Sequence, residues 1–161
     1  MAAPPAFILG EFHRTIDERF RLSIPVELAE PLTAGGSDCF LAKERPGSLS
    51  LWSAAHWRAQ LDSGVELVKN KIQSGRLEGR IEQVQLLGRL LSTRHKSVQL
   101  TGRGRLLIPA GFREFLGVEP GSELLIVGAA VCVEIWQPQA WISYLEQQMP
   151  EFRRLFDSLS S

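Results

Sequence analysis

The sequence is poor in the features that mark secreted or membrane-spanning proteins. It has only two cysteines in 161 residues, Cys39 and Cys132, which are too few for a disulfide framework or a cysteine metal site. We therefore expect two buried free thiols in a reducing cytoplasm. No uncharged apolar run is long enough to span a bilayer, and the first ten residues lack the basic segment that opens a secretory signal. These absences predict a cytoplasmic protein without a membrane partner.

The sequence also lacks the motifs of an enzyme. Its three histidines, His13, His56 and His95, have no metal-ligand spacing such as H-x-x-x-H, and neither cysteine has neighbours that would lower its pKa. There is no phosphate-binding P-loop and no nucleophile elbow. We expect histidines with surface or packing roles, no catalytic residues, and no metal, cofactor or small-molecule substrate.

The charge is balanced in total but not in its distribution. Lys and Arg number 18 and Asp and Glu number 18, which by itself argues against a nucleic-acid partner. However, no acidic residue lies between Glu82 and Glu114. Six cations lie in that window: Arg89, Arg94, Lys96, Arg103, Arg105 and Arg113. A block of one sign creates a local field that attracts polyanions, although a solvated basic face without a partner fits the same pattern.

The most informative feature that is present is a duplication. Five residues recur 84 positions later: Arg19, Arg21, Leu22, Ile24 and Pro25 as Arg103, Arg105, Leu106, Ile108 and Pro109. The four tryptophans form matched pairs at the same offset, Trp52 with Trp136 and Trp57 with Trp141. This offset exceeds the ~20–50-residue periods of solenoids and propellers, so the sequence predicts two tandem copies of one small module. Such a module presents the same surface twice, and here that surface carries paired arginines.

Each arginine motif is predicted to be a β-hairpin whose outgoing strand has one wet face. Leu22 and Ile24 alternate with Arg21, and Leu106 and Ile108 follow the same pattern in the second copy. This period of two is typical of a half-buried strand with its arginines facing water. A proline that suits the first turn of a helix, a short helix and a second hairpin follow in each copy. Each copy therefore reads β-β-α-β-β, and the fold class is α+β.

We expect four parts along the chain. They are a first domain at 10–54, a helical linker at 55–94, a second domain at 95–138 and a C-terminal helix at 139–161. Ser53 is predicted to cap the first linker helix, and Gly117 to end the short helix of the second copy. The second linker helix is predicted from apolar residues at helical spacing: Leu77, Ile81, Val84, Leu87 and Leu91. We interpret the tryptophan pairs as core anchors where a strand meets a helix, rather than as platforms for base stacking.

A hairpin followed by R-x-R-L-x-I-P, a short helix, a second hairpin and a duplicated copy of the whole resembles the MraZ family of bacterial transcriptional regulators. These proteins are built from two SpoVT-AbrB domains of the swapped-hairpin type, and the resemblance covers roughly residues 10–141. The family pattern places an Asp, three residues and then an Arg in each turn. Asp17 and Arg21 fit this pattern, whereas Thr101 replaces the acidic residue of the second turn. Phe20 replaces the usual turn glycine, so we expect a turn that needs no positive φ at that position, or a more strand-like geometry.

The resemblance implies a sequence-specific DNA-binding regulator, because a guanidinium can hold a phosphate or the O6/N7 edge of guanine. The predicted DNA-binding residues are Arg19, Arg21, Arg103 and Arg105, with Asp17 and Thr101 ordering the turns. It also implies ring-like homo-oligomers in the cytoplasm, associated with the nucleoid. They would bind short direct repeats in double-stranded DNA and repress a cell-division and cell-wall gene cluster.

Two other interpretations stay open from the residues alone. Considered in one copy only, the arginines could decorate a strand for solubility or pair with Asp17 and Glu18. The chain could also be a protein-interaction or assembly scaffold of the swapped-hairpin class that does not bind DNA. A salt titration separates these classes, since a DNA binder loses affinity steeply as salt rises and a scaffold binds no DNA even at low salt.

Overall fold

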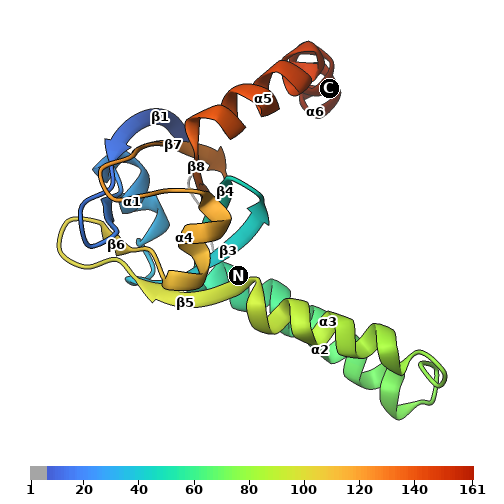
Figure 1. Cartoon of the computed structure of the whole chain (residues 1–161). Coiled ribbons are helices and arrows are strands. Elements are labelled where there is room, and N and C mark those ends of the chain that lie inside the picture. The colour runs from blue at the N-terminus through green and yellow to red at the C-terminus, as the bar shows by residue number, and fades with distance from the viewer. Residues whose placement is uncertain (1–6) are drawn as a thin grey trace.

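Two repeats of five elements form the body of the protein, which the computed structural model describes over residues 7–161 (Figure 1). The first repeat contains β1 Ile8–Thr15, β2 Arg21–Ser23, α1 Val26–Leu32, β3 Asp38–Arg45 and β4 Ser48–Ser53. The second contains β5 His95–Gln99, β6 Arg105–Leu107, α4 Ala110–Leu116, β7 Glu123–Ala130 and β8 Val133–Trp136. The predicted β-β-α-β-β order and the α+β class are confirmed.

Two helical arms extend from this body. The first arm is α2 Ala54–Gln73 and α3 Ile81–Thr93; the second is α5 Pro138–Gln148, the 3₁₀ segment η1 Met149–Glu151 and α6 Phe152–Ser160. Figure 1 shows the two arms leaving the body at different places and in different directions. Over residues 7–161, none of the helices combines the length and the apolar character needed to cross a membrane.

The two repeats exchange strands instead of building separate sheets. The large sheet has the order β1-β7-β8-β4-β3-β5, and β2 pairs with β6 in a separate two-stranded ribbon. β1 of the first repeat therefore pairs with β7 of the second, and β5 of the second repeat pairs with β3 of the first. This exchange agrees with the swapped-hairpin type that the resemblance implies, whereas the prediction that each arginine motif forms a hairpin within its own copy is wrong.

The reason for the exchange lies in the length and burial of β2 and β6. Each strand has only three residues, and an isolated two-stranded hairpin is marginal in water even with longer strands. Pairing between repeats places Leu22 opposite Leu106, and both side chains are completely buried. Burying a leucine fully contributes about 1.5–3 kcal/mol. Both repeats thereby complete one shared core.

The predicted inward-facing residues lie in this core. Leu22, Ile24, Leu106 and Ile108 belong to a single cluster of buried side chains. The period of two therefore assigned the buried face of β2 and β6 correctly. The two cysteines are buried free thiols, as predicted. Burial raises the pKa of Cys39 to about 11 and that of Cys132 to about 12, so neither is a reactive thiolate at neutral pH.

Some helix ends lie where the sequence predicts them, and others do not. Ser53 caps α2 by accepting a hydrogen bond from the amide of His56 at 3.3 Å, and Gly117 ends α4 with φ +75°; both predictions are confirmed. Leu77 precedes α3, which begins at Ile81, so its assignment to that helix is wrong. The predicted C-terminal helix is interrupted at η1, where Pro150 cannot donate a main-chain hydrogen bond.

The tryptophan pairs join strand ends to helices. The rings of Trp52 and Trp57 are 5.8 Å apart, and those of Trp136 and Trp141 are 5.1 Å apart. Trp136 is buried and the other three are half-buried. The anchor interpretation therefore holds for Trp136 fully and for the others in part. His95 packs beside Trp57, at 5.2 Å between ring centroids, and burial lowers its pKa.

Candidate nucleic-acid interface

The β2–β6 ribbon brings arginines from both repeats onto one surface. Arg21 pairs with Leu107, and Ser23 pairs with Arg105. All four side chains lie on the face opposite the buried leucines, because side chains alternate along each strand. Arg21 and Arg105 are thus diagonal neighbours, with Cα atoms roughly 7–8 Å apart by standard sheet geometry. The sequence placed them in two separate hairpins, and the structure brings them together.

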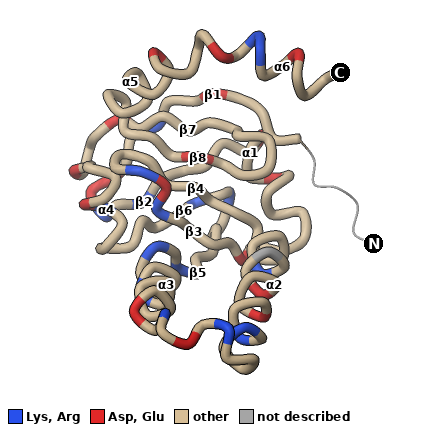
Figure 2. Tube along the Cα trace, turned by 90° about the vertical axis from the view of Figure 1, so that its right-hand side faces the viewer, with Lys and Arg blue, Asp and Glu red and all other residues tan. Residues whose placement is uncertain are grey.

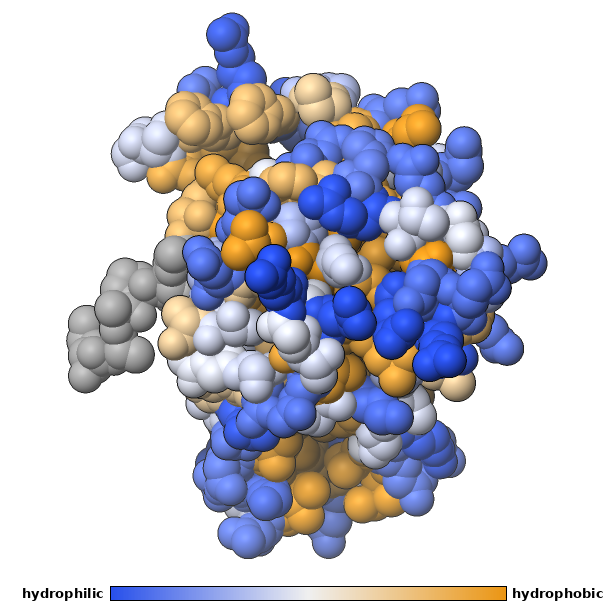
Figure 3. Space-filling model, turned by 90° about the vertical axis from the view of Figure 1, so that its left-hand side faces the viewer, coloured by the Kyte–Doolittle hydropathy of each residue, from blue (hydrophilic) through white to orange (hydrophobic). Residues whose placement is uncertain are grey.

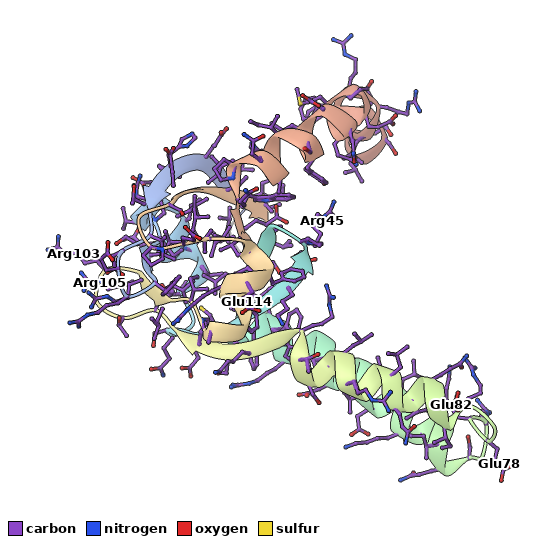
Figure 4. All side chains as sticks on the ribbon, in the orientation of Figure 1. Arg45, Glu78, Glu82, Arg103, Arg105 and Glu114 are labelled. Atoms are coloured by element: carbon purple, nitrogen blue, oxygen red, sulfur yellow. The ribbon has the colours of Figure 1, made fainter. Side chains whose placement is uncertain are left out.

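The remaining two predicted arginines lie in the turns that lead into this ribbon. Arg19 is exposed in the turn before β2, and Arg103 is exposed in the turn before β6. Figure 4 shows Arg103 and Arg105 at one extremity of the molecule, with their side chains directed away from the body. Figure 3 views the molecule from that side, and hydrophilic side chains occupy the centre of this face.

The first turn is organised by Asp17. Its Oδ1 accepts hydrogen bonds from the amides of Arg19 and Arg21, each at 2.8 Å. Its Oδ2 accepts a bond from Nε of Arg21 at 2.9 Å, which also makes an ion pair. The main chain closes the turn with bonds from the amide of Asp17 to the carbonyl of Arg21 and from the amide of Phe20 to the carbonyl of Asp17, both at 3.0 Å. One carboxylate thus bonds to both the main chain of the turn and the guanidinium of Arg21.

These bonds keep Asp17 ionised. The amide of Arg21 is the largest cause of the lowered pKa of this carboxyl, and the amide of Arg19 and the guanidinium of Arg21 add to it. Desolvation acts in the opposite direction and is outweighed. Acidic and basic residues lie close together along this turn, and Figure 2 shows that charges of both signs are spread over the body and both arms.

The second turn has the same plan with different chemistry. The amide of Thr101 donates to the carbonyl of Arg105 at 2.9 Å, and the amide of Arg105 donates to the carbonyl of Thr101 at 2.8 Å. The Thr101 hydroxyl donates a 3.4 Å bond to the carbonyl of Arg105, whereas Asp17 accepts bonds from two amides of the first turn. Gly102 and Gly104 have φ of +56° and +89°, a region that glycine enters without steric cost. The main chain and two glycines define this turn.

The expectation of a turn without positive φ at Phe20 is wrong. Phe20 has φ +60°, in the same left-handed region as Gly104 at the equivalent position of the second repeat. The geometry of the turn, set by its closing hydrogen bonds, therefore outweighs the preference of the side chain. Its ring is partly buried against the core, which compensates for part of the strain.

Two cations of the acid-free window are occupied in main-chain contacts. Arg94 donates to the carbonyls of Lys43 and Glu44, the latter at 2.9 Å, and Arg113 donates through Nε to the carbonyl of Ile108 at 2.8 Å. Their charges remain, but their guanidinium groups are positioned by the fold. The exposed cations of the second turn are Arg103 and Arg105.

The histidines lie in surface and ring contacts. Across the described residues, no three His, Cys, Asp or Glu side chains converge in a way that could hold a metal ion. His13 contacts Glu123 through Nδ1 at 2.8 Å on the exposed side of β1. His56 stacks on Trp52, with ring centroids 5.5 Å apart. Both arrangements are those of surface and packing histidines.

Comparison with known proteins identifies what the chain is similar to. The family model described as "MraZ protein, putative antitoxin-like" matches residues 93–157. A protein named Transcriptional regulator MraZ from Roseiflexus sp. (strain RS-1) is 31% identical over 143 residues, covering 85% of each chain. The protein of the same name from Symbiobacterium thermophilum is 30% identical over 139 residues, covering 86% of this chain and 90% of its own. That from Syntrophomonas wolfei is 24% identical over 151 residues, covering 94% and 95%.

Proposed function

The chain belongs to the MraZ family, and from this premise we propose that it is a DNA-binding transcriptional regulator that acts through the β2–β6 ribbon. The observation that carries the proposal is the cross-repeat pairing, which gives Arg21 and Arg105 a common outer face. A two-stranded ribbon is narrow enough to enter the major groove of B-DNA. Relatives covering most of this chain are named transcriptional regulators.

Arg21 and Arg105 are the lead contacts in this proposal, with Arg19 and Arg103 beside them. The fork of a guanidinium can grip a phosphate or read the O6/N7 edge of guanine, and each good bidentate base contact is worth about 1–3 kcal/mol of discrimination. Asp17 orders the first turn, and Thr101 has the corresponding place in the second. The proposed role is that of a repressor that binds short direct repeats ahead of a cell-division and cell-wall gene cluster, in the cytoplasm and on the nucleoid.

We propose that binding requires a homo-oligomer. One ribbon offers few phosphate and base contacts, too few for tight specific binding at physiological salt. Repetition of the ribbon on a closed assembly would raise the affinity through effective concentration, without new contacts. This also accounts for DNA binding by a chain whose total charge is zero.

The helical arms carry the surfaces that suit contact with a second copy. A groove of about 400 Å³ lies between α2 and α3, lined mainly by Leu61, Val65, Val68, Val84, Leu87 and Leu91. It is the apolar hollow between hydrophilic rims at the lower edge of Figure 3. α6 exposes four large apolar side chains: Phe152, Leu155, Phe156 and Leu159. A groove on one arm and an apolar helix on the other suit a head-to-tail contact, which closes into a ring when the rotation allows.

The apolar match supports the second copy as the occupant of the groove, whereas charge does not decide it. α6 carries Asp157 beside Arg153 and Arg154, and Lys69 lines the groove and pairs with Glu66. A Phe156→Glu variant should lower the molar mass in light scattering and weaken DNA binding. Arg76→Ala, an exposed change at the tip of the first arm, should alter neither. A wild-type chain that is an 18.0 kDa monomer and still binds DNA tightly would contradict the requirement for an oligomer.

The direct test of function is a fluorescence-anisotropy titration with DNA from the region upstream of the chain's own gene. Arg21→Ala and Arg105→Ala should each lose about 1–3 kcal/mol of specific binding while the thermal unfolding midpoint stays close to wild type. Both side chains lie on the outer face of the ribbon, so their loss leaves no cavity. Arg76→Ala is the matched control for removal of one exposed arginine. Unchanged binding by both ribbon variants would refute the assignment, and no binding even at low salt would favour an assembly scaffold that uses the apolar arms.

A further inference from the structure

The strand exchange places each turn against the helix of the other repeat. Gly104 lies beside Ala29 of α1, so close that an added Cβ would be 3.2 Å from the Cβ of Ala29. Phe20 lies beneath Arg113 of α4, whose guanidinium carbon is 4.1 Å from the centroid of the Phe20 ring. Phe20 and Gly104 are equivalent at the 84-residue offset, and so are Ala29 and Arg113. The same contact is thus made by a large pair on one side and a small pair on the other.

The large pair belongs to a closed set of contacts. The amide of Ile108 donates to the carbonyl of Phe20 at 2.9 Å. The carbonyl of Ile108 accepts from Nε of Arg113 at 2.8 Å, and the Arg113 guanidinium covers the Phe20 ring. Three residues from both repeats therefore hold one another through two hydrogen bonds and a cation–π contact. We call this set the Phe20 clamp.

The first turn needs such a clamp for a steric reason. Phe20 has φ +60°, where a bulky side chain is strained, and a strained residue keeps its conformation only when its surroundings fix it. Phe20 also borders an open cleft of about 730 Å³, which gives its ring room to leave. The contact with Arg113 opposes that movement. The residue after Phe20 is Arg21, so the conformation of Phe20 sets where the arginine strand begins.

The second turn needs no clamp. Gly104 enters the left-handed region without a side-chain penalty. It is also packed tightly, since an added Cβ would approach the carbonyl oxygen of Ile24 to 2.8 Å. The amide of Ile24 donates to the carbonyl of Gly104 at 2.8 Å, the counterpart of the bond between Ile108 and Phe20. Gly104 and Ala29 therefore hold the second turn through close packing of small residues, whereas Phe20 and Arg113 hold the first turn through a cation–π contact.

We propose that Arg113 is a positioning residue for DNA recognition: through Phe20 it fixes the turn at residues 17–21 and thereby the direction of Arg21. The proposal rests on the function proposed above and adds to it a residue that lies on α4, outside both arginine motifs. A planar guanidinium is required, because the residue must donate through Nε and cover an aromatic face at the same time. Arg21 is then already ordered before DNA binds, which lowers the conformational entropy lost on binding.

The test combines a measurement without DNA and one with it. Amide hydrogen exchange of the free protein should accelerate about three- to tenfold at Arg19 and Arg21 in Arg113→Lys, which keeps the charge but loses the planar contact. The amide of Arg105, in the second turn, is the internal control and should not change. Core amides such as that of Leu22 report whether the variant is folded. Unchanged exchange at Arg19 and Arg21 in a folded Arg113→Lys variant would overturn the clamp.

The DNA measurement is a cycle between Phe20→Gly and Arg113→Ala. Arg113→Ala should weaken binding about three- to tenfold in the native background. In the Phe20→Gly background its effect should fall below about twofold, because glycine needs no support at φ +60° and the double variant reproduces the pair found at Gly104 and Ala29. An equal loss in both backgrounds, or full binding by Arg113→Lys, would mean that Arg113 acts through its own charge, and the proposal would be wrong. If wild type binds no DNA at all, the proposed function fails while hydrogen exchange still decides on the clamp.

Discussion

The two turns of the ribbon have equivalent positions in one fold and reach their geometry by different means. Asp17 holds the first turn with three hydrogen bonds, two to amides and one to the guanidinium of Arg21. The second turn is held by two main-chain bonds with Thr101 and by glycine at positive φ. The side chains of the first turn are therefore ordered, but the charge of Arg21 is already paired with that of Asp17. The second turn keeps the charge of its arginines unpaired, but has fewer side-chain bonds to order it. Duplication preserved the geometry of the turn and left its chemistry free to diverge.

This difference bears on how each turn would hold DNA. Long-range attraction to phosphate depends on uncompensated charge, and Arg103 and Arg105 are exposed without an acidic residue in their turn. Arg21 has Asp17 as an ion-pair partner at 2.9 Å, and Glu18 lies in the same turn. An exposed ion pair contributes only about 0–1 kcal/mol of stability. We therefore expect charge to outweigh order, so that the second turn contributes more to affinity.

The largest expected effect comes from removing both arginines of one turn. Arg103→Ala with Arg105→Ala should reduce DNA affinity and the salt dependence of binding more than Arg19→Ala with Arg21→Ala does. Each lost phosphate contact should reduce the slope of log affinity against log salt by about 0.9. Anisotropy titrations at several salt concentrations measure both quantities. A larger loss from the first pair would show that turn order, and not local charge, limits binding.

A smaller effect should separate the two residues that begin the turns. Asp17→Ala removes an acceptor of three hydrogen bonds, whereas Thr101→Ala removes one long bond at 3.4 Å and leaves the main-chain pair intact. Asp17→Ala should therefore lower the thermal unfolding midpoint and accelerate exchange of the Arg19 and Arg21 amides more than Thr101→Ala affects its own turn. Equal effects of the two variants would mean that the main chain alone defines both turns.

The smallest effect is confined to acid. The pKa of Asp17 in the folded protein is depressed below the value of 3.8 expected for an unperturbed carboxyl. The stabilisation by its ionised form is therefore complete above that value and is lost as the pH falls through the lower folded pKa. A carboxyl titration by NMR should show no change near neutral pH and a midpoint below 3.8, which Arg21→Ala should move upward. A midpoint that does not respond to Arg21→Ala would contradict the contribution of that arginine.

Local patterns in the sequence predicted the element order and the buried residues of the ribbon. Leu22 and Ile24 alternate with polar neighbours whether their strand pairs within its own repeat or across to the other, so this pattern reports the buried face and not the partner. The repeat offset is limited in the same way. It aligns Phe20 with Gly104, but it does not show that each turn packs against the helix of the other repeat. The Phe20 clamp is visible in the sequence as a difference between equivalent positions, with Phe20 and Arg113 in place of a glycine and an alanine. Only the strand exchange shows that these two positions are in contact.

The strand exchange also has a consequence for synthesis of the protein. Ile8 pairs with Ala130, and Leu22 pairs with Leu106. The first repeat therefore leaves the ribosome long before the strands with which it pairs have been made. Folds dominated by such distant contacts pay the entropy of chain closure first and fold slowly. A polypeptide that ends within α3 contains β2 but lacks β6. The ribbon therefore cannot form, and Arg21 has no ribbon surface on which to lie. Under the proposed function, competence to bind DNA would arise only when the second repeat has been made, so prematurely terminated chains would not bind the operator.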